Sequence, residues 1–172
     1  MNGFVLFVPV MLIRYGLLYF LNKEAFKRAA FFPPLGGKEK AAFWIYQIST
    51  LFIFVYMFFL EVMIESLWFY VGTVVYCMGV LLCGISVVNY ANPSESGINL
   101  KGLYKISRNP MYMAFFFCFL GCALLTKSLI LLAAVIVFQV SAHWIILSEE
   151  RWCRDKFGDE YMQYMKNVRR YF

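Results

Sequence analysis

Charged residues are scarce in this chain. Asp, Glu, Lys and Arg make up 15% of its 172 residues, hydrophobic types make up 62%, and the mean hydropathy is +0.67. A soluble domain is roughly a quarter charged and about half apolar, so the composition excludes an ordinary soluble domain. The sequence therefore predicts an all-α, multi-pass integral membrane protein in which residues 1–172 form a single domain.

The chain also lacks the short motifs of soluble nucleotide, metal and hydrolase sites. It has no Gly-x-Gly-x-x-Gly after a strand, no Walker-type phosphate loop, no His-Glu-x-x-His and no Gly-x-Ser-x-Gly. Its five cysteines form no Cys-x-x-Cys pair, which favours packing roles, and we expect no metal site. Most of the basic residues fall in three segments separated by apolar spans, so nucleic-acid binding is not expected.

Five long hydrophobic runs are present, and about twenty apolar residues cross a bilayer as a helix. They are Asn2–Leu21, Ala41–Leu60, Leu67–Tyr90, Met111–Leu125 and Ser128–Leu147. The fourth run is short unless Arg108–Pro110 opens its first turn, where the missing N–H of Pro costs nothing. Short turns at Glu61–Ser66 and Thr126–Lys127 predict tight helix connections. Residues 1–100 would form three spans, and residues 101–172 would form the remaining two and the cofactor-binding part.

Basic residues predict the orientation of the chain in the membrane. The connections between the runs alternate in basic residues. The first connection (residues 22–40), the third (residues 91–110) and the tail (residues 148–172) are rich in Lys and Arg, whereas the second (residues 61–66) holds none and the fourth (residues 126–127) holds only Lys127. This alternation predicts the N-terminus outside, the C-terminus in the cytoplasm, and the binding site on the cytoplasmic side. Arg14 lies within the first run. We expect it to snorkel toward an interface; the alternative is that it faces an acidic group in the bundle.

The tail after the last run is the only strongly amphipathic segment. Its apolar residues recur every three to five positions: Trp152, Phe157, Tyr161, Met165, Val168 and Phe172. The pattern is typical of a helix that lies in the membrane interface with its apolar face down. Gly158 is expected to bend the tail so that Tyr161 and Tyr164 close over a bound cofactor. The alternative is a tail that merely lies on the membrane.

Few polar side chains stand out against this background. His143 is the only histidine, and on a helix it shares a face with Glu150, seven residues later. Glu149 and Glu150 follow the last run. Two adjacent carboxylates suit a cationic or polyhydroxyl ligand, and they equally suit a solvated helix end. Taken alone, Arg108 indicates a positive-inside anchor, and His143 a structural hydrogen-bonding residue.

Together these residues resemble a known superfamily. In order and spacing, the last 71 residues resemble the isoprenylcysteine carboxyl methyltransferases and phospholipid methyltransferases, through Gly102-Leu103-Tyr104, Arg108-Asn109-Pro110-Met111-Tyr112, His143, Glu149-Glu150, Phe157-Gly158-Asp159-Glu160-Tyr161, Tyr164 and Arg169. That superfamily has an Arg-His-Pro-x-Tyr element before a helical hairpin, then a Glu-Glu pair and a Phe-Gly-x-x-Tyr-x-x-Tyr tail. Asn109 stands where His is common. Because Asn does not transfer protons near pH 7, a mechanism with that residue as base is not expected here.

The resemblance implies S-adenosyl-L-methionine as the cofactor. The cofactor-binding residues it implies are Gly102, Leu103, Tyr104, Arg108, Asn109, Pro110, Tyr112, His143, Glu149, Glu150, Tyr161 and Tyr164, with Arg108 and His143 as catalytic candidates. Aromatic faces such as Tyr104 or Tyr112 suit the sulfonium. Arg108 or His143 would bind the carboxylate. The two glutamates would accept from the hydroxyls and the ammonium, and Leu103, Pro110 and the tail aromatics would flank the adenine.

The activity implied is methyl transfer to a lipid-like or small hydrophobic nucleophile at the membrane, such as a prenylcysteine carboxylate or a phospholipid amine. Two other classes stay open. One is a non-catalytic cofactor-binding or adaptor membrane protein. The other is a small transporter or channel subunit, for which Gln47 and Gln139 are among the few polar residues within the spans. The C-terminal part also resembles that of the sterol reductases, but this chain has no obvious room for a ring-system pocket and NADPH.

Overall fold

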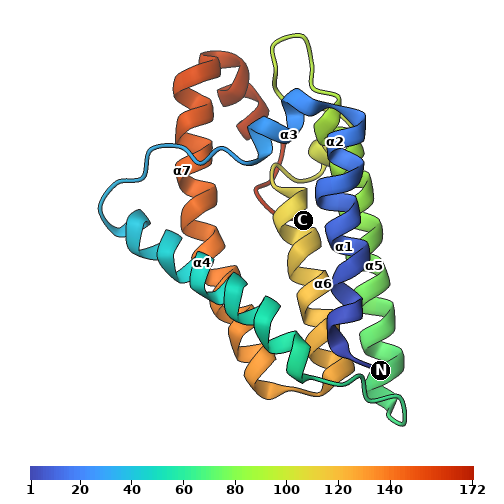
Figure 1. Cartoon of the computed structure of the whole chain (residues 1–172). Helices are drawn as coiled ribbons and strands as arrows, with labels where there is room; N and C mark the ends of the chain where they lie inside the picture. The colour runs from blue at the N-terminus through green and yellow to red at the C-terminus, as the bar shows by residue number, and fades with distance from the viewer.

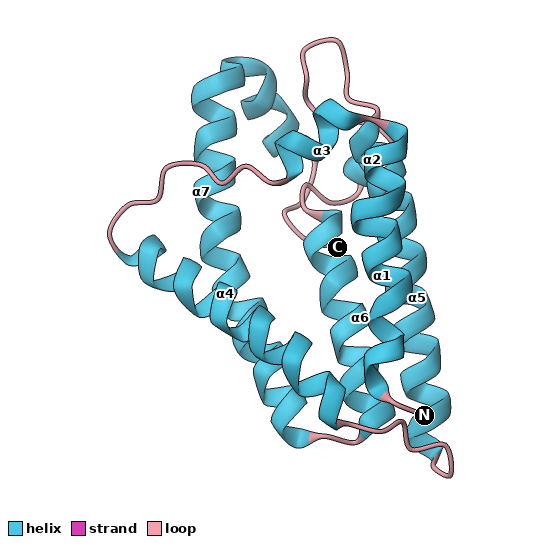
Figure 2. Cartoon of the chain, in the orientation of Figure 1, coloured by secondary structure: helices cyan, strands magenta, loops and turns pink.

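The computed structural model describes all 172 residues, and every regular element in it is helical (Figures 1 and 2). The first span is built from η1 (Gly3–Leu6), α1 (Phe7–Met11), the π-helical η2 (Leu12–Leu17) and α2 (Leu18–Leu21). The remaining elements are α3 (Lys23–Ala29), α4 (Lys38–Tyr56), η3 (Met57–Phe59), α5 (Leu67–Ala91), η4 (Gly102–Lys105), α6 (Pro110–Thr126) and α7 (Leu129–Asn167). The all-α prediction is confirmed.

Four helical stretches are long and apolar enough to cross a membrane. They are Gly3–Leu21, Lys38–Phe59, Leu67–Ala91 and Leu129–Asn167. The first three begin and end within three residues of the predicted runs, whereas the last continues past the predicted end at Leu147 into the tail and ends at Asn167. α6 has 17 residues and is shorter, although Pro110 opens its first turn as expected. Large apolar side chains are exposed along these stretches, which suits contact with lipid. The chain is a multi-pass membrane protein, and the count of five spans stays a prediction.

α5 and α6 pack tightly because small residues line their contact. A side chain at Gly79 would come within 2.5 Å of the backbone nitrogen of Cys118, and one at Gly121 within 2.6 Å of Tyr76. Small residues let helices approach in a membrane, where burial from water does not drive helices together. The first span lies beside this pair, and α4 packs on α7 instead (Figure 1).

The main core lies toward the end of the molecule that holds the N-terminus. Phe7, Ile53, Phe119 and Phe138 meet there from the first span, α4, α6 and α7. The tight connection of α6 to α7 is confirmed, with Lys127 in the left-handed region at φ 48°. Toward the other end, α4 and α7 diverge from the first span, α5 and α6 (Figure 1).

The loop between α5 and η4, helix α3 and the C-terminal half of α7 gather at that other end (Figure 1). Arg151 of α7 pairs there with Glu39 of α4 at 2.6 Å. At the N-terminal end, Asn2 forms an isolated bridge with Glu61. The structure therefore brings the third connection and the tail together, and which side faces the cytoplasm stays a prediction.

The tail was predicted to lay its apolar face in the membrane interface, but in the structure that face packs against the rest of the protein. α7 bends at Gly158, which has φ 55° and ψ −130°, as the sequence indicated. Beyond the bend, Tyr161 and Tyr164 are buried and pack with Ile98 of the third connection. An amphipathic pattern shows that one face of a helix is buried, but it does not show whether lipid or another part of the protein buries it. Here the third connection covers the apolar face of the tail.

Candidate functional site

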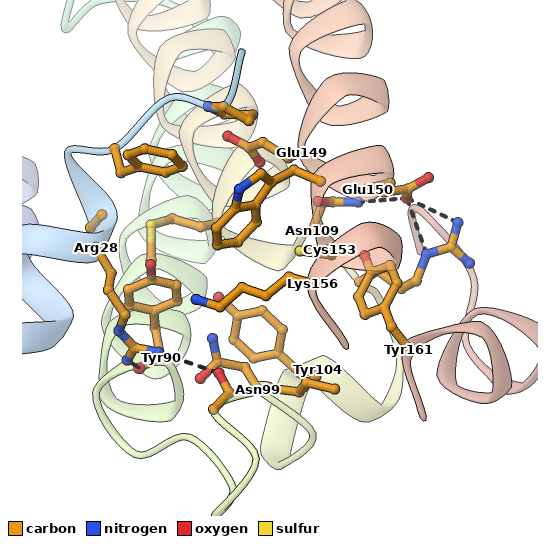
Figure 3. Close-up of a pocket in the computed structure, with 18 of the residues that line it drawn as sticks. Arg28, Tyr90, Asn99, Tyr104, Asn109, Glu149, Glu150, Cys153, Lys156 and Tyr161 are labelled. Carbon is orange, nitrogen blue, oxygen red and sulfur yellow. Dashed lines mark hydrogen bonds and ion pairs between the residues drawn. The ribbon is translucent and has the colours of Figure 1, made fainter. Parts of the chain in front are cut away.

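A cavity of about 650 Å³ lies where the two groups of helices diverge, and the first span, α4, α5, α6 and α7 all line it. Small-molecule sites typically measure roughly 300–1,000 Å³. Figure 3 shows Arg28, Tyr90, Tyr104, Glu149 and Lys156 arranged around this space. Of its 27 lining residues 15 are hydrophobic, so a few polar groups decide what it can bind.

Glu149 is the cavity carboxylate that has no ion-pair partner. Tyr112 donates its O–H to Glu149 Oε1 at 2.7 Å. No Lys, Arg or His nitrogen lies within 4.0 Å of the Glu149 carboxylate, and its Oε2 accepts no hydrogen bond from the protein. Tyr112 reaches this position because α6 begins at Pro110, two residues earlier. Glu149 is therefore free to accept hydrogen bonds from a ligand.

Arg108, Glu150 and Arg170 form a closed ionic network, which we call the clasp. Arg108 donates to Glu150 Oε1 from Nε at 3.1 Å and from Nη2 at 2.9 Å. Arg170 donates to both Glu150 oxygens at 2.8 to 3.1 Å. Arg108 Nη1 donates to the carbonyl oxygens of Met165 at 3.1 Å and Val168 at 2.6 Å. With four hydrogen bonds inside the protein, Arg108 has little donor capacity left for a ligand.

The clasp docks the C-terminal residues 168–172 beside the start of α6. The Arg108 amide donates to the Arg169 carbonyl oxygen at 2.8 Å, and Ser107 Oγ donates to that of Arg170 at 3.1 Å. Asn109 lines the cavity, but its Nδ2 donates to Glu150 Oε1 at 3.4 Å and to the Arg170 carbonyl at 3.3 Å. The amide of Asn109 therefore serves the clasp.

The predicted tyrosines do gather at the cavity. Tyr104, Tyr161 and Tyr164 line it, and Tyr164 donates its O–H to the Tyr104 carbonyl oxygen at 2.6 Å. Burial raises the pKa of Tyr104 well above its usual value, so its hydroxyl stays protonated and able to donate. The tail thus covers one side of the cavity with aromatic rings.

Gly102, Leu103 and Pro110 do not line the cavity. Gly102 has φ 58°, and a side chain there would collide with the Asn89 carboxamide. The Leu103 amide donates to Asn89 Oδ1 at 2.9 Å. Gly102, Leu103 and Pro110 shape the backbone that carries Tyr104 and Tyr112. They therefore support the site but do not line the cavity.

His143 is the clearest departure from the sequence-based expectation. Its Nδ1 lies 2.7 Å from the Tyr171 hydroxyl, and it lines a separate open hollow with Gln139 and Trp144. His143 and Glu150 do share a face, since they contact the consecutive residues Tyr171 and Arg170. However, seven residues span roughly 10 Å along a helix, so only Glu150 reaches the cavity.

Sequence reasoning missed Arg14 and the aromatic mouth of the cavity. Arg14 does not snorkel through lipid; its Nη2 donates to the Ala29 carbonyl oxygen at 3.0 Å, because the end of α3 supplies an acceptor inside the protein. At the mouth, the Arg28 guanidinium lies 5.3 Å from the ring centre of Tyr90, and Lys156 Nζ lies 4.5 Å from that of Trp152. The sequence marked Arg14 as a charge within a span and Trp152 as part of the apolar pattern of the tail, but no motif connected either residue with the cavity.

Comparison with known proteins gives three findings. A family model described as phospholipid methyltransferase matches residues 67–160, more than half of the chain. Methanethiol S-methyltransferase 1 of Bradyrhizobium diazoefficiens is 39% identical over 66 residues, which are 38% of this chain. The match covers 22% of that protein, so the chain spans about a fifth of this relative's length. No solved structure gives a significant match.

Proposed function

Because the chain belongs to the phospholipid methyltransferase family, we propose that it transfers a methyl group from S-adenosyl-L-methionine to a lipid-like or small hydrophobic nucleophile. The observation that carries this proposal is the cavity, which combines aromatic walls with polar groups that have no protein partner. The family name points to phospholipid acceptors, and the relative's name points to a thiol. Both acceptors are nucleophiles that an apolar cavity can admit.

The cavity suits the proposed cofactor in three respects. Its volume is adequate. Glu149 Oε2 and the buried Asn99 Oδ1 lack protein donors, and the cofactor's hydroxyl and ammonium groups are donors. Tyr104 and Tyr112 line the cavity and have no protein cation over their rings, so an aromatic face is available for the sulfonium. Glu149, Asn99 and these aromatics would hold the cofactor.

When bound, S-adenosyl-L-methionine supplies an electrophilic methyl group. The protein's task is to align the nucleophile and exclude water, and alignment alone is worth about 7–11 kcal/mol. Tyr161 and Tyr164, held by the clasp, cover the cavity on the side of the tail. An amine acceptor must also lose a proton, and Glu149 is the cavity carboxylate without an ion pair. A thiolate or carboxylate acceptor needs no base.

The test is incubation of the purified protein, in neutral detergent or nanodiscs, with methyl-labelled S-adenosyl-L-methionine and either fractionated lipids or small alkyl thiols. The expected result is label in one acceptor fraction, reduced by Glu149→Gln. Binding of S-adenosylhomocysteine without transfer to any fraction would support a non-catalytic cofactor-binding or adaptor protein instead. Absence of both binding and transfer would overturn the proposal.

A further inference from the structure

Arg14 occupies an unusual backbone position in the first span. It lies inside the π-helical turn Leu12–Leu17, within an apolar stretch of 19 residues. π-helical turns are rare and occur often at functional sites. A charged residue within a membrane span is costly and is retained mainly where it has a task. Both features lead to the question of what Arg14 binds.

The guanidinium of Arg14 is poorly satisfied by the protein. Its one hydrogen bond runs from Nη2 to the Ala29 carbonyl oxygen, and its Nη1 is buried without a partner. The group lies 5.9 Å from the ring centre of Phe115, a contact that leaves the N–H donors in its plane available. Arg108, which lines the same cavity, makes four hydrogen bonds. Arg14 therefore differs from Arg108, because Arg14 keeps donors that the protein does not use.

No acidic residue pairs with Arg14. The ion pairs of the protein involve Glu24, Glu39 and Glu150, and none of them includes Arg14 or Glu149. The Arg14 side chain is half-buried, and a buried N–H donor without an acceptor, such as its Nη1, is unfavourable. An oxyanion entering the cavity would supply the missing acceptor for Nη1 and the missing counter-charge. Glu149 lines the same cavity but lies beyond ion-pair distance of Arg14, so it does not fill this role.

We propose that Arg14 is the anion-binding residue of the cavity and receives a carboxylate or phosphate oxygen of the bound ligand. The inference rests on the proposed function, because that function supplies two ligands with such a group. The cofactor carries an α-carboxylate beside its ammonium. A lipid-like methyl acceptor can carry a phosphate or a carboxylate.

Arg28→Gln is the matched control for Arg14→Gln. Both changes remove one positive charge from the lining of the same cavity. The Arg28 guanidinium, however, already donates to the carbonyl oxygens of Gly97 at 3.3 Å and Tyr90 at 3.5 Å. A purely long-range effect of charge would appear in both variants, whereas direct binding would appear only at Arg14. Arg14→Lys keeps the charge and tests the result should Arg14→Gln fold poorly.

The experiment measures dissociation constants for wild type and variants in neutral detergent with four probes. S-adenosylhomocysteine carries the carboxylate, and 5′-methylthioadenosine lacks the amino-acid group. Decyl phosphate mimics an anionic acceptor, and decanol is its neutral counterpart. Loss of one charge-assisted contact should weaken binding roughly ten- to a hundredfold. We expect this loss in Arg14→Gln for one of the two anionic probes, with smaller losses in Arg14→Lys and Arg28→Gln.

Each outcome decides a separate point. Weaker S-adenosylhomocysteine binding with unchanged methylthioadenosine binding assigns Arg14 to the cofactor carboxylate. Weaker decyl phosphate binding with unchanged decanol binding assigns it to the acceptor. Equal effects in Arg14→Gln and Arg28→Gln, or no effect on either anion, overturn the inference. If the wild type binds no S-adenosylhomocysteine, the proposed function fails, and the decyl phosphate comparison still decides the role of Arg14.

Discussion

Glu150→Gln tests whether the clasp holds the end of the chain in place. The Glu150 side chain is 4% exposed and that of Arg108 is 8% exposed, so their ion pair is shielded from water. The amide keeps the size of the carboxylate but leaves Arg108 buried without a counter-ion. Removing one partner of a buried ion pair costs about 3–5 kcal/mol. We expect the lower end of this range, because Arg108 keeps two backbone acceptors and Arg170 is 31% exposed.

That cost should fall on the docking of residues 168–172 rather than on the core between the spans. A loss of about 3 kcal/mol raises the undocked fraction by roughly two powers of ten. Hydrogen–deuterium exchange of the purified protein in neutral detergent measures this directly. The Arg108 amide, which donates to the Arg169 carbonyl, should exchange faster by about that factor. Affinity for S-adenosylhomocysteine should fall as well, since Tyr161 and Tyr164 lose their support.

Arg169→Ala is the control for this experiment. Arg169 neighbours Arg170, but its side chain is exposed and takes part in no ion pair. It should leave exchange and affinity unchanged. If the Arg108 amide of Glu150→Gln exchanges like that of wild type, then the ion pairs do not hold the C-terminal segment and the reasoning is wrong.

Further predictions follow from the same site. Glu149→Gln should lower affinity for S-adenosylhomocysteine roughly tenfold without lowering the melting temperature, because it removes a ligand acceptor and no ion pair; calorimetric titration and a melting curve decide, and unchanged affinity would show that Glu149 does not bind the cofactor. His143→Ala should leave affinity and turnover within about twofold of wild type, because His143 lines a different hollow; a large loss of turnover would restore its catalytic candidacy. Truncation after Gly158 should abolish binding even in neutral detergent, where no anionic surface exists, because it removes Tyr161, Tyr164 and Arg170; normal binding would show the tail to be an anchor only. A cysteine-accessibility scan should label Glu61–Ser66 and the tail from opposite sides, and labelling from one side would contradict the orientation.

The spans could be predicted because a bilayer imposes a length on every crossing helix. Runs of apolar residues mark that length directly, and the ends of α5 and α6 fall within a residue of the predicted ones. The bend of α7 at Gly158 could also be predicted, because a glycine changes the helix through its own backbone conformation. What covers the tail depends on where a distant loop lies, and hydrophobic periodicity carries no such information.

Several of the residues that the resemblance groups together line one cavity, and their roles as binding residues stay predictions. Tyr104, Tyr112 and Glu149 are examples. The resemblance did not show that Arg108 donates to the carbonyl oxygens of Met165 and Val168. These acceptors lie some sixty positions later in the sequence and come close only in the folded chain. Arg14 looked like a residue that reaches for an interface, and the π-helical turn that presents it has no sequence signature.

The two adjacent glutamates show how one short motif can serve two purposes. Successive residues on an α-helix point about 100° apart, so Glu149 and Glu150 cannot face the same partner. Glu149 meets Tyr112 and keeps one oxygen for a ligand, whereas Glu150 is enclosed by two arginines. Arg108 shares the one negative charge of Glu150 with Arg170, and its side chain already makes four hydrogen bonds within the protein, so it has little donor capacity left for an anion. This arrangement leaves Arg14 as the cavity cation with a buried and unpartnered donor. Substitution of the two arginines should therefore have different effects. Removal of Arg108 should undock the C-terminal segment, whereas removal of Arg14 should alter ligand binding while that segment stays docked.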